Sequence, residues 1–173
     1  MSKKPTIYLD TNIPSVLHYR GASVATIHQQ MVTREWWETE RKWFQVLGSV
    51  FTEGELRQGE FAGQEQAIRL VRRLRYMPFT AAVRECAQMY LGHRLIPKEY
   101  PGDAVQLAFA TIYKVDYLLT WNYAHLANLD VQRRLRAINS RRGWRTPYLV
   151  SPETIPRVGL GQTIWRRDDD AEN

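Results

Sequence analysis

The chain has 173 residues, 44% of them hydrophobic and 24% charged, which is the balance of a single globular domain, and no apolar run reaches the 18 or so residues that a transmembrane helix needs. One cysteine, Cys86, excludes an internal disulfide and a thiolate zinc site, and four scattered histidines lack the paired spacing of a histidine zinc centre, so any metal would be a hard cation held by oxygen. The net charge of +6 suits a polyanionic partner, although the needs of a soluble surface would explain it equally well.

Short apolar runs and amphipathic runs alternate along the whole chain. Strands are predicted at residues 6–9, 46–51, 76–79, 117–120 and 147–150. Helices are predicted after Asn12, over about 24–45, after Thr52, and over 64–74, 80–95, 103–113 and 125–136. This alternation predicts an α/β domain, a three-layer α/β/α arrangement with a mainly parallel central sheet.

The pattern gives no sign of a second domain. We expect one domain over residues 1–155 and a C-terminal tail over 156–173 that ends in an acidic run and is partly disordered. The apolar stretch at residues 7–9 is too short to be the core of a signal peptide, so we expect a cytoplasmic protein with no membrane partner.

Three of the predicted helices begin with a capping pattern. Asn12 can cap the first helix. Thr52 and Glu55 have the spacing of a capping box at the next predicted helix start. Asp103 can cap a later helix, with Gln106 three residues further on.

Three carboxylates, Asp10, Glu55 and Asp103, are placed by this pattern at the same edge of the sheet, because each follows a strand or opens a helix there. Taken singly, each has a structural explanation as a turn residue, a cap or a partner of a helix dipole. Taken together, they would repel one another unless a cation lay among them. Oxygen ligands with retained water are what Mg²⁺ prefers, so the trio is a candidate metal site.

The chain resembles the PIN domain family over residues 5 to about 155, in four motifs that follow the family's order. They are residues 8–12 (Tyr-Leu-Asp-Thr-Asn), 55–56 (Glu-Leu), 102–111 (Gly-Asp-Ala and the helix after it) and 115–128 (which includes Trp-Asn and His-Leu). The resemblance implies a PIN-like fold and cleavage of RNA, with Mg²⁺ or Mn²⁺ held by Asp10, Glu55 and Asp103. Many bacterial members are VapC-like toxins, so it also implies a small antitoxin partner, and a homodimer by analogy.

One position departs from the family pattern, because a fourth acid is often found where this chain has Asn122. An amide oxygen can still face a metal or hold a water, so we keep Asn122 in the catalytic set and expect a weaker second metal site. The expected reaction is hydrolysis by a metal-activated water in line with the leaving sugar oxygen. Asn12 and Thr120 are candidates to orient the carboxylates, or are an ordinary cap and strand residue. Asp116 precedes its strand and is expected at the opposite edge of the sheet.

Several basic and aromatic residues could contact RNA. Six arginines between residues 133 and 145 could bind its backbone or form a solvated helix face. Trp36, Trp37 and Trp43 could stack on bases, although their helical spacing favours packing in the core. His125 could touch a phosphate or could be a packed side chain.

Two other functions remain open. A phosphatase that used Asp10 as nucleophile would carry a second aspartate two positions later, where this chain has Asn12. A catalytically degenerate PIN scaffold that binds RNA or a protein would account for Asn122. Such a scaffold would still bind RNA after Asp10→Ala and would show no Mg²⁺-dependent cleavage.

Overall fold

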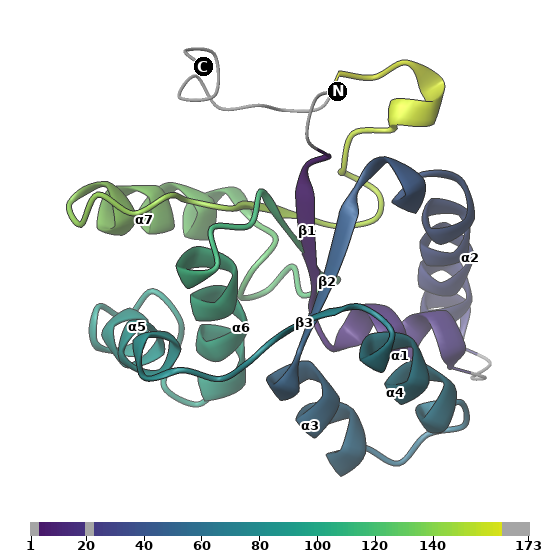
Figure 1. Cartoon of the computed structure of the whole chain (residues 1–173), viewed down its shortest axis with the longest axis horizontal. Helices are drawn as coiled ribbons and strands as arrows, with labels where there is room; N and C mark the ends of the chain where they lie inside the picture. The colour runs from purple at the N-terminus through teal and green to yellow at the C-terminus, as the bar shows by residue number, and fades with distance from the viewer. Residues whose placement is uncertain (1–3, 20–22, 164–173) are drawn as a thin grey trace.

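The computed structural model describes residues 4–19 and 23–163, and these form a central sheet with helices packed on both of its faces (Figure 1). The strands are β1 (Thr6–Leu9), β2 (Gln45–Ser49), β3 (Arg75–Met77), β4 (Tyr117–Leu119) and β5 (Tyr148–Val150). The helices are α1 (Asn12–His18), α2 (Val24–Thr39), α3 (Val50–Gln58), α4 (Gln64–Arg72), α5 (Ala81–Gly92), α6 (Pro101–Ile112) and α7 (Leu129–Ser140), with 3₁₀ turns η1 (Arg41–Trp43) and η2 (Val158–Leu160).

The five strands are ordered β3-β2-β1-β4-β5, and every pairing is parallel. The register sets Tyr8 of β1 opposite Leu47 on one side and Leu118 on the other. The chain builds outward from β1 first through β2 and β3, and then through β4 and β5, so the order reverses between β1 and β4. Ligand crevices of open α/β sheets form at such a reversal, beyond the carboxyl ends of the strands.

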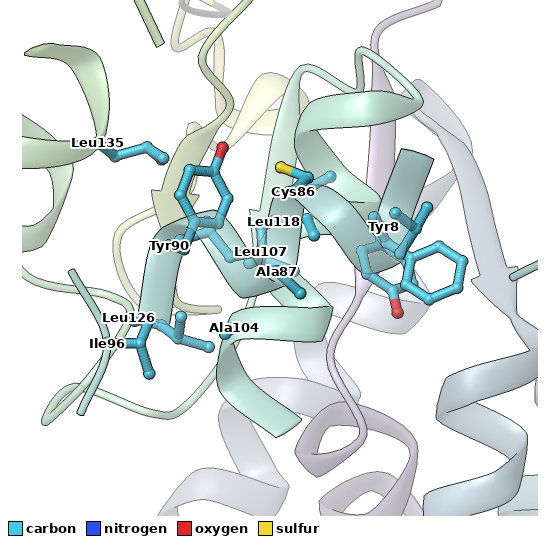
Figure 2. Packing of buried hydrophobic residues seen from close by; sticks show 14 of the residues in the cluster. Tyr8, Cys86, Ala87, Tyr90, Ile96, Ala104, Leu107, Leu118, Leu126 and Leu135 are labelled. Atoms are coloured by element: carbon cyan, nitrogen blue, oxygen red, sulfur yellow. The ribbon is translucent and has the colours of Figure 1, made fainter. Parts of the chain in front are cut away.

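The two faces of the sheet bury separate apolar clusters, because side chains alternate along a strand. Tyr8 packs with Phe109 and Leu118 in the layer of α5, α6 and α7, part of which Figure 2 shows. Ile7 and Leu9 point the other way and pack in the layer of α1 and α2. The predicted three-layer α/β/α arrangement with a parallel sheet is therefore confirmed.

All five predicted strands are present, with β3 at an edge of the sheet as predicted, but β2 ends at Ser49, because Val50 and Phe51 already belong to α3. Two predicted helices differ most in their bounds. The helix predicted over 24–45 ends at Thr39, since the chain must extend from Phe44 to pair β2 with β1. The helix predicted from His125 begins at Leu129, because the Asn128 side chain accepts the amide hydrogen of Val131 as its cap.

All three predicted caps are wrong. Asn12 lies inside α1 and its side chain turns to the sheet edge instead. Ser49, the last residue of β2, caps α3 by accepting from the Thr52 amide, so α3 starts before the predicted capping box. Helix α6 starts at Pro101, whose fixed φ suits the first helical position, so Asp103 lies within its first turn.

The segment after residue 155 still contacts the domain. Ile155 is buried in the cluster that contains Trp36, and the amide of Gly159 donates to Glu40 Oε2 at 2.9 Å. The acidic end of the predicted tail, within 164–173, lies outside the described residues. None of the helices in residues 4–19 and 23–163 has both the length and the apolar character needed to cross a membrane.

Candidate active site

Asp10 lies directly after β1, at the carboxyl edge where β1 and β4 meet, and is only 5% exposed. Its Oδ2 accepts hydrogen bonds from the Thr120 hydroxyl at 2.5 Å and from the Asn12 amide nitrogen at 2.6 Å. The amide oxygen of Asn12 accepts from the Trp121 backbone at 2.9 Å, which ties the turn after β1 to the end of β4. Asn12 and Thr120 therefore orient the Asp10 carboxyl, which is one of the two roles that the sequence allows for them.

The electrostatic setting of Asp10 is unusual for an aspartate. Burial, opposed by the hydrogen bond from Thr120 and reinforced by the negative charges of Glu55 and Asp103, raises the pKa of Asp10 from 3.8 to about 7. A positive charge at this edge would lower the pKa again by favouring the ionised carboxyl.

Glu55 projects from the middle of α3, the helix that directly follows β2. Its Oε2 accepts from the Thr11 hydroxyl and from the Gln106 amide nitrogen at 2.8 Å. The Gln106 amide oxygen in turn accepts from the buried hydroxyl of Tyr8. A network that spans β1, α3 and α6 therefore fixes one oxygen of the Glu55 carboxyl group.

Asp103 lies in the first turn of α6, whose start faces the same edge of the sheet. Its Oδ2 accepts from the Asn122 amide nitrogen at 3.0 Å and lies 2.8 Å from His125 Nδ1. The Asn122 amide oxygen accepts a hydrogen bond from the His125 backbone N–H at 3.0 Å. This bond turns the Asn122 amide nitrogen toward Asp103. The His125 ring also packs against Tyr100, with ring centroids 4.0 Å apart and the rings tilted by 40°. Asn122 and His125 thus act as positioning groups for Asp103 in this structure.

Gly102 allows α6 and α3 to approach closely beside the acids. A Cβ atom placed on Gly102 would lie 2.9 Å from Glu55 Oε1, a distance at which the carboxyl group has to move. We expect Gly102→Ala to weaken the affinity for Mg²⁺ by about tenfold, as displaced metal-site partners typically do, while the fold is kept. Gly54→Ala is the matched control, because nothing lies within 4 Å of a Cβ at that helical glycine. Equal Mg²⁺ affinities of the two variants, measured by calorimetric titration, would contradict this role.

The four predicted site residues thus come from four segments and reach one edge of the sheet. Hydrogen bonds join Asp103 to Asn122, Thr11 links the Asp10 turn to Glu55, and Asp10 carries the electrostatic effect of both other acids. However, no group of three or more His, Cys, Asp or Glu side chains within the described ranges is arranged so that it could hold a metal ion. Metal ligation by these acids therefore stays a prediction.

The sequence does not reveal the site roles of three contributors. Thr11 stands only within a motif, and the spacing of Gln106 predicts a capping partner of Asp103. For His125 the sequence allows both a phosphate contact and a packed side chain. The spacing of Asp103 and Gln106 on one helix shows that they share a face, but only the packing of α6 against α3 reveals that Gln106 binds Glu55.

The arginines of 133–145 do not share one surface. Arg133 pairs with Asp130 on α7 at 2.9 Å, whereas Arg145 pairs with Asp116 at 2.8 Å. Asp116 also accepts from the Thr6 backbone at 2.7 Å, which places it at the opposite edge of the sheet from Asp10, as predicted.

The three tryptophans also differ from one another. Trp36 is completely buried, so it packs in the core and cannot stack on a base. Trp37 packs partly buried against the same cluster, and Trp43 is 41% exposed.

Comparisons with known proteins give little support for assigning the chain to a family. No model of a known protein family matches the chain, and no curated protein matches it. Among solved structures, the chain is similar to the crystal structure of VapBC2 from Rickettsia felis bound to a DNA fragment from their promoter, with 15% sequence identity and a TM-score of 0.49. The alignment covers 84% of this chain and 98% of that chain. A likeness of this size does not assign the chain to a family.

Proposed function

We propose that the chain is a metal-dependent ribonuclease that hydrolyses RNA phosphodiesters at the carboxyl edge of β1 and β4. The observation that carries the proposal is the buried carboxyl of Asp10, which hydrogen bonds connect through Thr120 and Asn122 to Asp103, while the next residue, Thr11, bonds to Glu55. Burial and the charges of the two other acids raise the pKa of Asp10 to about 7. Strongly perturbed groups in a crevice are typical of functional sites. Three acids with this placement favour a divalent cation more than they favour a structural role.

The chemistry of the donors fits Mg²⁺ or Mn²⁺. Asp10, Glu55 and Asp103 offer only oxygen, which these hard cations prefer. The hydrogen bonds described above end on Oδ2 of Asp10, Oε2 of Glu55 and Oδ2 of Asp103. When bound, the ion would offset charge on the phosphodiester and make water more acidic.

The surrounding side chains would keep the acids in place during the reaction. Thr120 and Asn12 hold Asp10, Thr11 and Gln106 hold Glu55, and Asn122 holds Asp103. Each donates a hydrogen bond to a carboxylate, and such donors stabilise the ionised form that a cation needs. In this arrangement Asn122 supports a ligand and does not have to be one.

The resemblance of the four motifs to the PIN domain family also implies partners and a cellular compartment. We propose that the chain is cytoplasmic, forms a homodimer, and is neutralised by a small antitoxin protein in the manner of VapC-like toxins. Light scattering of the purified chain tests the dimer. Co-purification with the product of a neighbouring gene tests the antitoxin.

The function is tested by cleavage of a labelled single-stranded RNA with Mg²⁺ or Mn²⁺, comparing the wild type with Asp103→Asn. We expect the variant to lose at least about 100-fold in rate, because the charge that holds the ion is removed while the shape is kept. Equal cleavage by both preparations would place the activity elsewhere. Binding of RNA by the wild type without metal-dependent cleavage would instead support a degenerate scaffold.

A further inference from the structure

A cavity of about 560 Å³ adjoins the candidate site on the side of α7. It is lined by the segment 94–99 between α5 and α6 and by the first turn and a half of α7. His125 belongs to both places, because its ring lines the cavity while Nδ1 lies 2.8 Å from Asp103 Oδ2. Since a carboxylate only accepts, Nδ1 is the donor, and Nε2 on the far side of the ring points away from Asp103.

The lining of this cavity favours an anion. It carries three cationic side chains, Arg94, Lys98 and Arg134, against the acids Glu99 and Asp130. Asp130 pairs with Arg133, which is outside the lining, at 2.9 Å and with Arg134 of the lining at 3.7 Å. Arg94 and Lys98 then stand against Glu99, so positive charge remains beside the acids of the candidate site, where a polyanion would otherwise be repelled.

The cavity wall is held in place before any ligand arrives. The Arg134 guanidinium donates to the backbone carbonyl of Arg94 at 2.5 Å, which pins the loop to α7. Arg94 adopts the left-handed region with φ of 53°, which turns the loop sharply, and the next amide, that of Leu95, bonds to the Tyr90 carbonyl at 3.0 Å. Binding to such a preformed wall does not require the loop to be ordered first.

We propose that this cavity holds the nucleotide of an RNA strand next to the phosphodiester that is cut, with its backbone phosphate between Arg94 and Lys98. The inference rests on the proposed ribonuclease function. It states where the RNA strand lies beyond the phosphodiester that is cut. The volume lies within the range of about 300–1,000 Å³ that small-ligand sites occupy. The shared residue His125 places the cavity next to Asp103, which favours a strand that passes both over a separate free anion.

The test measures RNA binding without divalent metal, by fluorescence anisotropy of a labelled single-stranded RNA with 2′-O-methyl groups. The double variant Arg94→Asn, Lys98→Gln removes two charges, and asparagine tolerates the left-handed backbone at residue 94. The matched control Arg84→Gln, Arg136→Gln removes two charges from exposed positions of α5 and α7 outside the lining. We expect the first variant to lose about tenfold in affinity, and its log-log salt dependence to become shallower by about 0.7 for the one phosphate that both cations contact. The control should stay within about twofold of the wild type.

Cleavage kinetics separate this inference from the proposed function. With Mg²⁺, the cavity variant should raise KM about tenfold and keep kcat within about twofold, since it removes binding and leaves the acids untouched. If the wild type cuts RNA while the cavity variant binds and cuts like the control, the cavity assignment is wrong and the function stands. If the wild type neither binds nor cuts RNA, the function fails and the cavity assignment fails with it. A thermal melt checks that each variant is folded. If the double variant does not fold, the single variant Lys98→Gln is measured in its place.

Discussion

Asp10→Asn is expected to remove RNA cleavage and, at the same time, to make the metal-free protein more stable at pH 8. The fold holds Asp10 with a pKa of about 7 against an ordinary value of 3.8, so ionising it at pH 8 costs up to about 4 kcal/mol of stability. The asparagine keeps an oxygen for Thr120 and Asn12 to bond and carries no charge. Without the negative charge the ion loses a ligand, and we expect a loss of about 1,000-fold in cleavage.

The sign of the pH dependence distinguishes this gain in stability from a change in stability that does not depend on the ionisation of Asp10. Because the pKa of Asp10 is raised in the fold, its favourable contribution is complete below pH 4 and is lost as the pH rises through 7. The difference in unfolding free energy between the variant and the wild type in EDTA should therefore grow from near zero at pH 4 to its maximum near pH 8. Denaturant unfolding at several pH values measures it. A variant that is less stable than the wild type at pH 8, or that still cuts RNA at the wild-type rate, would contradict this account of Asp10.

Phe109→Ala is expected to cost about 3–5 kcal/mol of folding stability, the range for a large aromatic side chain in a core. Phe109 is completely buried on α6, with ring centroids 5.8 Å from Tyr8, 5.9 Å from Phe79 and 5.9 Å from Tyr113. The ring fixes α6 against β1, and α6 carries Asp103 at its start. Urea unfolding measures the loss, with Met31→Ala as control because Met31 is 66% exposed. A loss below about 1 kcal/mol would mean that this layer of the core is not packed as described.

Most of the fold could be predicted because its signals are local. Strand β1 ends in an apolar stretch, residues 7–9, that stops at Asp10, and β4 is a similar apolar run before Thr120. Both lie at the centre of a parallel sheet, where strands are apolar on both faces. Alternation with helices then makes a parallel sheet the natural arrangement, and the shared edge for Asp10 and Asp103 follows from it.

The fine structure of the site could not be predicted, because local patterns compete there with tertiary contacts. Asn12 has a good capping pattern, yet its amide binds Asp10 and the Trp121 backbone. Gln106 has the spacing of a capping partner, yet it links Glu55 to Tyr8. Polar side chains near a helix start can satisfy either role, and the sequence does not show which neighbour the fold will bring to them.

The central claim is that Asp10, Glu55 and Asp103 share one divalent ion. Crystals soaked with Mn²⁺ test it most directly, through the anomalous scattering of the metal. We expect a strong peak about 2 Å from carboxyl oxygens of these three residues, and its loss in crystals of Asp103→Asn. Manganese bound only at other positions, or a peak that stays unchanged in the variant, would contradict the claim.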